Sequence, residues 1–559
     1  MSLLKTILQL ATVLLVLYGA KMLLGTTGSN KPKAPLPPGP KPLPLVGNVA
    51  DLPPKGAREW EHWIKHKDLY GPISSVTAFG TTIIILHDPK LAVELLERRG
   101  NIHSSRPRMI FGNEMCGWEH FLASQSYGNR LRAFRQKFHR FMGTRAALSG
   151  FHHLQDLEAH RFLLRVLRTP DRLLQHVRTE AGAIILKMAY GYTIEPHEED
   201  PLVSIADRAL SQFSAAFVPG GWLVDTIPIL RYLPDWMPGA DFKRTAREWH
   251  ATVSETAEKP MRFVRGEMDA GKYEPSYVSD LYEKAGGKMT AEDEYVTKWS
   301  AASMYTGGAD TVSNSPSTTA DDAVALSPAT YWVMQANEPQ TVSTVQTFFL
   351  AMMMYPEVQR KAQEEIDRVV GSQRLPCFED RGHLPYVEAV VSEALRWHPV
   401  APMGLPHVTT QDDVFEGYLI PKGAMIVPNI WHFTHDPAVY KDPMSFNPDR
   451  FLSDSPPPNP RDYVFGFGRR ICPGRLLADS SVWITIAKSL AVFNIRKPVV
   501  DGRELEPTVL FTPGIISHSY PYTASAEPRS PKHADLIRAV ERDHPWEQSS
   551  GASLQSVKA

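Results

Sequence analysis

A single cysteine near the C-terminal end has the surroundings of a metal-ligating thiolate. In the stretch FGFGRRICPGRLLADSSVWITIAKSL (465–490), Pro473 and Gly474 follow Cys472 and open a long apolar helix. Backbone N–H groups and the positive end of the helix dipole lower the pKa of a thiol at such a helix start. A lone cysteine is more often an inert core residue, and no second cysteine or histidine stands at zinc-site spacing. These surroundings favour a thiolate ligand to a single metal centre.

The neighbours of this cysteine indicate what it would face. Gly466, Gly468 and Gly474 allow the backbone to come close to a flat ligand. Arg470 offers a fork of N–H donors that suits a carboxylate.

The pattern F-x-x-G-x-R-x-C-x-G is formed by Phe465, Gly468, Arg470, Cys472 and Gly474, and it resembles the haem-binding signature of the cytochrome P450 family at every position. The resemblance implies that Cys472 is the thiolate ligand of haem b iron and that Arg470 binds a haem propionate. Such a ligand favours O–O cleavage. It also implies a cytochrome P450 fold, mainly α with small β patches, in one large catalytic domain.

Further stretches resemble marks of the same family. Glu393 and Arg396 in EALR lie one helical turn apart and can pair. Arg450 in FNPDRF resembles the third member of a Glu-Arg-Arg cluster with a structural role.

The resemblance also implies further propionate donors. Arg135 in YGNRLRAFRQKF (127–138) resembles an arginine that binds a propionate, and His407 in GLPHV resembles another donor. Leu131 stands where the family usually has tryptophan, so this propionate contact of the family is in question, and Arg132 is the candidate to replace it.

The sequence GGADT (307–311) resembles the oxygen-side motif of the family's distal helix. Taken alone, the string indicates helix packing by small residues. Together with the cysteine motif it implies that Asp310 and Thr311 relay protons as an acid-alcohol pair. Ala309 would leave room for dioxygen.

The segment 312–340 interrupts this helix. It contains Pro316, Pro328 and Pro339, and each costs about 3 kcal/mol or more in a helix interior. Without it, GGADT continues directly into TVSTVQTFFLAM as one helical pattern. Its 29 residues correspond to 87 nucleotides, which preserves the reading frame, and its terminal codons can match the two ends of an intron. Our hypothesis is a translated, unspliced intron; the alternative is a surface loop, because long loops cost little entropy.

Five mostly apolar stretches are candidate walls of a substrate pocket, and ordinary core is the alternative interpretation for each. They favour a terpenoid, a steroid or a polycyclic aromatic as substrate. The stretches are 102–109, 213–217, Ala309, 400–405 and 513–516.

The N-terminal end differs from the rest of the chain. Residues 1–25 are almost wholly apolar and long enough to span a membrane once. Residues 26–48 form a proline-rich hinge. The lysines that follow the apolar run outnumber the single Lys5 before it, which predicts a cytosolic body, and the resemblance to microsomal members implies the endoplasmic reticulum.

The remaining chain is expected to form one domain, 49–524, followed at 525–559 by a polar, disordered tail with at most one short helix. Hairpins are predicted within 73–89 and around Pro421-Lys422-Gly423. Three cysteines give no disulfide framework, and a net charge of −1 gives no field for nucleic acid.

The leading hypothesis is a membrane-anchored monooxygenase that oxidises an apolar organic molecule, such as a fungal secondary metabolite or a xenobiotic. Its partner would be NADPH-cytochrome P450 reductase, because the chain has no convincing dinucleotide or flavin fingerprint. Two alternatives remain: a reductase-independent isomerase or dehydratase, and a haem-binding protein inactivated by 312–340.

Overall fold

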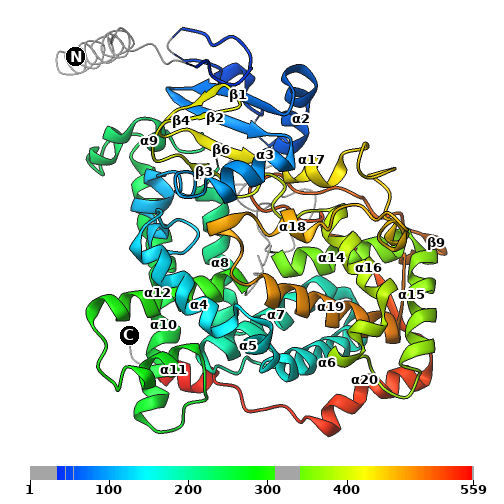
Figure 1. Cartoon of the computed structure of the whole chain (residues 1–559). Helices are drawn as coiled ribbons and strands as arrows, with labels where there is room; N and C mark the ends of the chain where they lie inside the picture. The colour runs from blue at the N-terminus through cyan, green and yellow to red at the C-terminus, as the bar shows by residue number, and fades with distance from the viewer. Residues whose placement is uncertain (1–33, 45, 55, 219, 309–339, 557–559) are drawn as a thin grey trace.

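The computed structural model describes residues 34–44, 46–54, 56–218, 220–308 and 340–556. Their fold is mainly helical with small sheets, as predicted, and the sheets lie at one end of the molecule and along its edge (Figure 1). The longer helices are α2 Glu59–Tyr70, α4 Asn129–Met142, α6 His152–Arg168, α7 Leu173–Tyr190, α8 Pro201–Ala216, α10 Asp241–Asp269, α11 Tyr277–Lys284, α12 Ala291–Gly308, α14 Gln340–Met354, α15 Pro356–Val369, α16 Pro385–Trp397, α19 Arg475–Val492 and α20 Pro531–Asp543. The short ones are α3 Pro89–Val93, α5 Arg145–Ser149, α9 Leu223–Thr226, α17 Ile430–His435, α18 Arg461–Val464 and α21 Gly551–Ser556.

The main sheet has the strand order β1-β2-β6-β3. Strands β1 Ile73–Ala78 and β2 Thr81–Leu86 form the predicted hairpin, and β6 Met425–Pro428 pairs with β2 in parallel. Phe79 and Gly80 have φ values of 47° and 82°, which is the geometry of a two-residue hairpin turn. Strand β3 is His407–Val408.

The second predicted hairpin is misplaced. The turn lies at Glu416-Gly417, with φ values of 50° and 79°, between β4 Asp413–Phe415 and β5 Tyr418–Ile420. The stretch after Pro421-Lys422-Gly423 becomes β6 and pairs with β2 and β3, not with β5. Two successive residues with positive φ are what a tight hairpin turn requires, and Glu416-Gly417 meets this requirement.

Helix α19 forms the centre of the largest core cluster. It is buried on nearly all sides, and it packs against α6, α14, α15 and α16. A helix covered on every side is held in place by its neighbours. The chain just before α19, which carries Cys472, therefore has a fixed starting point.

The prediction of a disordered tail is wrong. Strand β10 Ser525–Pro528 pairs with β7 Phe493–Arg496, and α20 and α21 follow. Ala534, Ile537 and Val540 recur every three residues on α20 and are buried. This apolar stripe is too short to be recognised in a segment of polar composition, but it packs against α6. The remaining short strands, β8 Val499–Val500 and β9 Arg503–Glu504, pair with each other.

Several predicted features lie outside the described residues. They are the anchor 1–25, Ala309, Asp310, Thr311 and nearly all of the segment 312–340. Where the chain is described, no helix is long and apolar enough to cross a membrane. The described part of the hinge packs on the sheets, because Ser75 and Leu419 donate backbone N–H bonds to the carbonyls of Pro38 and Pro35.

Candidate functional site

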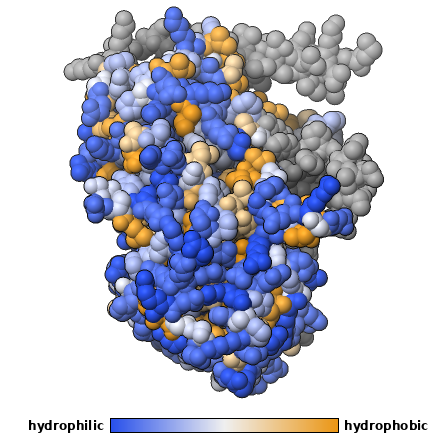
Figure 2. All heavy atoms as spheres, turned by 90° about the vertical axis from the view of Figure 1, so that its right-hand side faces the viewer, coloured by the Kyte–Doolittle hydropathy of each residue, from blue (hydrophilic) through white to orange (hydrophobic). Residues whose placement is uncertain are grey.

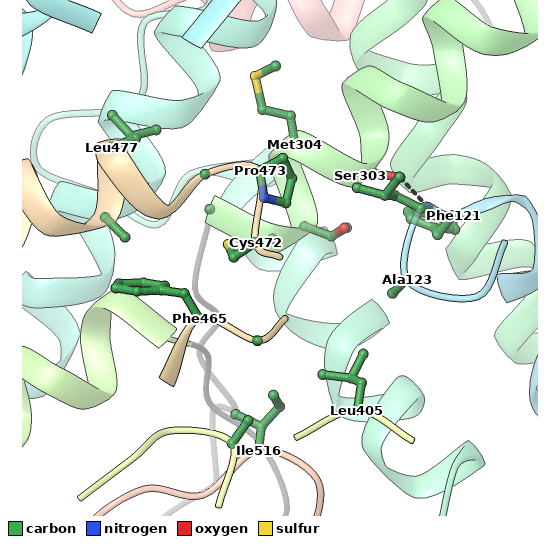
Figure 3. Close-up of a pocket in the computed structure, with 18 of the residues that line it drawn as sticks. Phe121, Ala123, Ser303, Met304, Leu405, Phe465, Cys472, Pro473, Leu477 and Ile516 are labelled. Carbon is green, nitrogen blue, oxygen red and sulfur yellow. Dashed lines mark hydrogen bonds between the residues drawn. The ribbon is translucent and has the colours of Figure 1, made fainter. Parts of the chain in front are cut away.

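Cys472 lies in the wall of a cavity of about 320 Å³. Figure 3 shows it among apolar side chains that come from distant parts of the chain. They include Phe121, Leu405, Phe465 and Ile516, and the end of α12 contributes Met304. The cavity is thus a mostly apolar space with one thiol in its wall.

The loop before α19 holds the cysteine. Its backbone N–H donates to the carbonyl of Phe465 at 2.8 Å, and α19 begins three residues later at Arg475. Burial raises the pKa of Cys472, while the Gly474 N–H and Arg135 act in the opposite direction. The predicted net lowering of the pKa is therefore wrong for the thiol alone, because desolvation outweighs the helix start. A coordinated cation would reverse this balance, since it deprotonates a thiol outright.

The glycines of the motif have different roles. Gly466 and Gly468 have φ values of 77° and 49°. A Cβ at Gly468 would also lie 2.7 Å from the backbone of Leu96 and Glu97, so this glycine is needed for packing against protein. A Cβ at Gly474 would meet no atom within 4 Å, and Gly474 lines the cavity. Among the three, Gly474 leaves open space at the cavity wall.

Three arginines line the same cavity, from separate segments: Arg106, Arg135 and Arg470. Arg470 donates to the backbone carbonyls of Ser104, Leu122 and Gln125. The three guanidinium groups are thus brought together by backbone contacts that span more than 300 residues of sequence.

Arg106 and Arg135 are held in a similar way. Arg106 donates to the carbonyls of Ala123, Leu405 and Pro406 at 2.7–3.0 Å. Arg135 donates to the carbonyl of Ile471, next to the cysteine, at 2.9 Å.

Within the described residues, the charge of these arginines is not balanced by an acid, because none of the three forms an ion pair with a carboxylate. Burial, followed by repulsion from Arg470, holds the pKa of Arg106 well below its usual value. Burial and Arg135 lower the pKa of Arg470 to about 10. Clustered, buried cations of this kind favour an anionic ligand with more than one carboxylate, and the two propionates of haem fit this donor set.

His407 lies at the same cavity, but its hydrogen-bonding differs from the expectation. Its Nδ1 is 2.7 Å from the carbonyl oxygen of His103, to which it donates. Burial, and then Arg106, holds the pKa of His407 well below its usual value, so the ring is neutral. Its Nε2 is then an acceptor. The role of His407 as a propionate donor stays a prediction that requires the other tautomer or a protonated ring.

The predicted Glu-Arg-Arg cluster is assembled away from the cavity. Glu393 accepts two hydrogen bonds from Arg396, at 2.7 and 2.8 Å, and one from Arg450 at 3.2 Å. Arg396 also donates to three backbone carbonyls of 434–445. The side chains of Glu393 and Arg396 are fully buried, so the cluster ties α16 to the segment that leads toward the cysteine loop.

Replacing Glu393 by glutamine should destabilise the fold by about 3–5 kcal/mol, because it leaves two buried guanidinium groups without their counter-charge. Urea unfolding of the purified chain would measure this loss. The matched control is Glu364→Gln, which removes an i,i+4 pair with Arg360 whose side chains are both more than half exposed. Its expected cost is about 0.5 kcal/mol or less, and equal losses for the two variants would contradict the role of the cluster.

Four of the five predicted wall stretches reach the cavity. The fifth, Ala309, lies outside the described residues. The contributing residues are Arg106, Phe213, Ser214, Ala401, Gly404, Leu405, Ile515 and Ile516. Leu131, which replaces the usual tryptophan, also lines the cavity and is buried.

Sequence reasoning missed several parts of this wall. Two of them are the stretch Trp118, Phe121, Leu122 and Ala123 and a face of α7 that includes Val177, Glu180, Ala181 and Ile184. The first has no regular spacing. The second has helical spacing, but an apolar face is as typical of core packing as of a cavity wall. Arg106 was expected only as a wall residue, because a single arginine in a loop carries no pattern.

Comparison with known families and proteins gives one consistent result. The family model described as Cytochrome P450 matches residues 37–319 and 335–524. The unmatched residues 320–334 fall inside the segment 312–340.

The chain is also similar to fungal proteins over nearly its whole length. It is 44% identical to cytochrome P450 monooxygenase ppsD of Aspergillus oryzae, over 99% of this chain and 100% of that protein. It is 45% identical to cytochrome P450 monooxygenase CLM2 of Gibberella zeae, over 94% and 95%. It is 41% identical to O-methylsterigmatocystin oxidoreductase of Aspergillus flavus, over 94% of both.

Proposed function

We propose, because this chain belongs to the cytochrome P450 family of oxidoreductases, that it inserts one oxygen atom of O₂ into an apolar organic molecule bound above Cys472. The family uses haem b with a cysteine thiolate ligand. The observation that carries the proposal is one thiol and three guanidinium groups around one mostly apolar cavity, where these guanidinium groups pair with no carboxylate of the described residues. Cys472 would ligate the iron, and Arg106, Arg135 and Arg470 would receive the propionates.

Bound haem would supply the oxygen chemistry, and the residues of this chain would do the rest. The apolar walls around Phe121, Leu405 and Ile516 would exclude water and hold the substrate near the haem face. Asp310 and Thr311 would hold protons beside it. A terpenoid or a polycyclic aromatic, as expected for a fungal secondary metabolite, would suit such walls; a xenobiotic is the second candidate.

Electrons would come from NADPH through a separate reductase. Helix α4 supports docking of an acidic partner, because it contains no acidic residue and exposes Arg132 and Arg140. Arg135 of the same helix lines the cavity, so the docking surface would lie close to the cofactor.

The test is reconstitution of the haem-loaded chain with NADPH-cytochrome P450 reductase, NADPH, ¹⁸O₂ and a panel of apolar substrates. The expected product contains one ¹⁸O atom and requires both NADPH and the reductase. A product that forms without reductase and without label would identify an isomerase or dehydratase instead. If the chain binds haem but converts no substrate of a broad panel, the result would favour the alternative hypothesis of an inactive haem-binding protein.

We further propose attachment to the endoplasmic reticulum membrane with the body in the cytosol. Besides the apolar run at 1–25, an exposed apolar patch in and around α9 supports lipid contact: Val218, Leu223, Ile227, Ile229, Tyr232 and Trp236. Trp236 and Tyr232 are 80% and 71% exposed, and such side chains favour the membrane interface. The face shown in Figure 2 contrasts with this patch, because it is largely hydrophilic with scattered apolar residues.

A fluorophore at position 236, attached after Trp236→Cys, should become strongly protected from an aqueous quencher when the full chain enters lipid nanodiscs. A fluorophore attached after Val500→Cys is the control, since Val500 is also exposed but lies in the β8–β9 hairpin, away from α9. Both cysteine variants should also carry Cys377→Ser, because the partly exposed thiol of Cys377 would otherwise be labelled too. Equal quenching at both positions would contradict lipid contact by the patch.

A further inference from the structure

One carboxyl group interrupts the apolar face that α7 turns toward the cavity. Val177, Ala181 and Ile184 recur at helical spacing along this face, and Glu180 lies among them. All four residues are buried. A buried carboxyl at a cavity wall needs a partner or a proton.

The hydrogen bonds around Glu180 favour a proton on its carboxyl. Its Oε1 is 2.6 Å from the Thr485 hydroxyl on α19, and that hydroxyl is 2.8 Å from the carbonyl of Ser481. A hydroxyl has one proton and can donate to only one of these acceptors at a time. If Glu180 is protonated, it donates to Thr485, Thr485 donates to Ser481, and both contacts are satisfied.

Within the part of the chain that the structure describes, no cation forms an ion pair with Glu180. On α6, Arg165 pairs with Glu158 at 3.5 Å. On α19, Lys488 binds Asp156 at 2.9 Å. Helix α14, which also packs against α7, contains no ionisable residue.

The electrostatic balance agrees with this geometry. Burial raises the pKa of Glu180 to about 8, and Glu158 adds to the shift, while Thr485, Arg165 and Lys488 oppose it. A carboxyl of this kind stays neutral at the pH of the cytosol.

We propose that Glu180 carries an exchangeable proton at neutral pH and delivers it to water in the cavity. In this step the carboxyl O–H bond breaks, a water oxygen takes the proton, and the Thr485 hydroxyl turns from Ser481 to the new carboxylate. The reverse transfer restores the acid. The step rests on the proposed function, because monooxygenation consumes two protons for each O₂, one oxygen atom of which leaves as water.

Infrared difference spectra of the haem-loaded full chain, recorded across pH, test whether Glu180 holds the proton. The expected spectrum has a carboxylic acid C=O band that shifts in D₂O, disappears as the pH rises through about 8 and is absent from Glu180→Gln. Glu365→Gln is the matched control, because the buried Glu365 carboxylate accepts backbone N–H bonds from Tyr386 and Val387 at 2.9–3.0 Å, away from the cavity. Its removal should leave the band unchanged. A band that persists in Glu180→Gln, or no such band in the parent chain, overturns the proposal.

A second variant and a second readout complete the test. Thr485→Val keeps the carboxyl but removes its hydrogen-bond partner, so the band should move in frequency without disappearing, even if Glu180→Gln folds poorly. In the reconstituted system, the share of consumed NADPH that appears as product should fall about tenfold or more in Glu180→Gln, with the carbon monoxide spectrum unchanged. Unchanged coupling would overturn the delivery of the proton. If no substrate is oxidised by any form, the proposed function fails, and the infrared band still decides whether Glu180 is protonated.

Discussion

Replacing Cys472 by serine should abolish the red-shifted Soret band that reduced, thiolate-ligated haem gives with carbon monoxide, and product formation should fall to background. A serine hydroxyl is not ionised at neutral pH and is a poor ligand for iron, so the electron density that favours O–O cleavage would be lost. The carbon monoxide difference spectrum and the turnover assay check both parts. No other exchange of a single atom in this chain is expected to have a larger effect on the spectrum and on product formation.

The control for this variant is Cys377→Ser. Cys377 is a partly exposed thiol that does not line the cavity, and its Sγ lies 3.2 Å from Asp380 Oδ2. Its replacement should leave the Soret band and the product yield unchanged. Cooperative thermal unfolding of both variants would show that the chains are folded. A thiolate spectrum that survives in Cys472→Ser, or that vanishes in Cys377→Ser, would place the iron ligand elsewhere.

Local sequence was sufficient to predict several features that depend on neighbouring residues, although it misplaced the turn between β4 and β5. The β1–β2 hairpin, the helix that begins after Cys472 and the Glu393–Arg396 pair all rest on spacings of a few residues. Side-chain direction within one helix or turn follows directly from such spacings. The same holds for Arg450, but only because its surrounding motif is similar to that of a known family.

Features that depend on contacts between distant segments were missed or misplaced. Arg106 joins the site because carbonyls near 123 and 405 hold its guanidinium. Glu180 becomes part of the cavity wall only when α7 packs against α19. The pKa of Cys472 was predicted in the wrong direction, because burial by the whole fold outweighs the local helix start. In each case the surroundings of the side chain decide its role, and residues far away in the sequence form these surroundings.

Removal of residues 312–340 should raise the haem content and the carbon monoxide signal of the expressed chain several-fold, toward one haem per chain, and should enable or strongly increase turnover. The physical reason is the cost of three prolines at about 3 kcal/mol or more each for a continuous helix. Helices α12 and α14 are described up to Gly308 and from Gln340, and both pack against α7. In the shortened chain, one apolar helical pattern would run along α7.

The control keeps the length but not the sequence. Replacing 312–340 by 29 glycine and serine residues preserves the interruption, so this variant should resemble the chain with its own insert rather than the shortened one. Sequencing the mature transcript across the codons of Thr311 and Thr341 provides an independent measurement, and the hypothesis expects the 87 nucleotides to be spliced out. A mature message that retains them, together with full activity of the longer chain, would instead establish a tolerated loop. The family match that skips 320–334 is consistent with either outcome, because an insertion relative to the family model can be an intron or a loop, and these two experiments separate them.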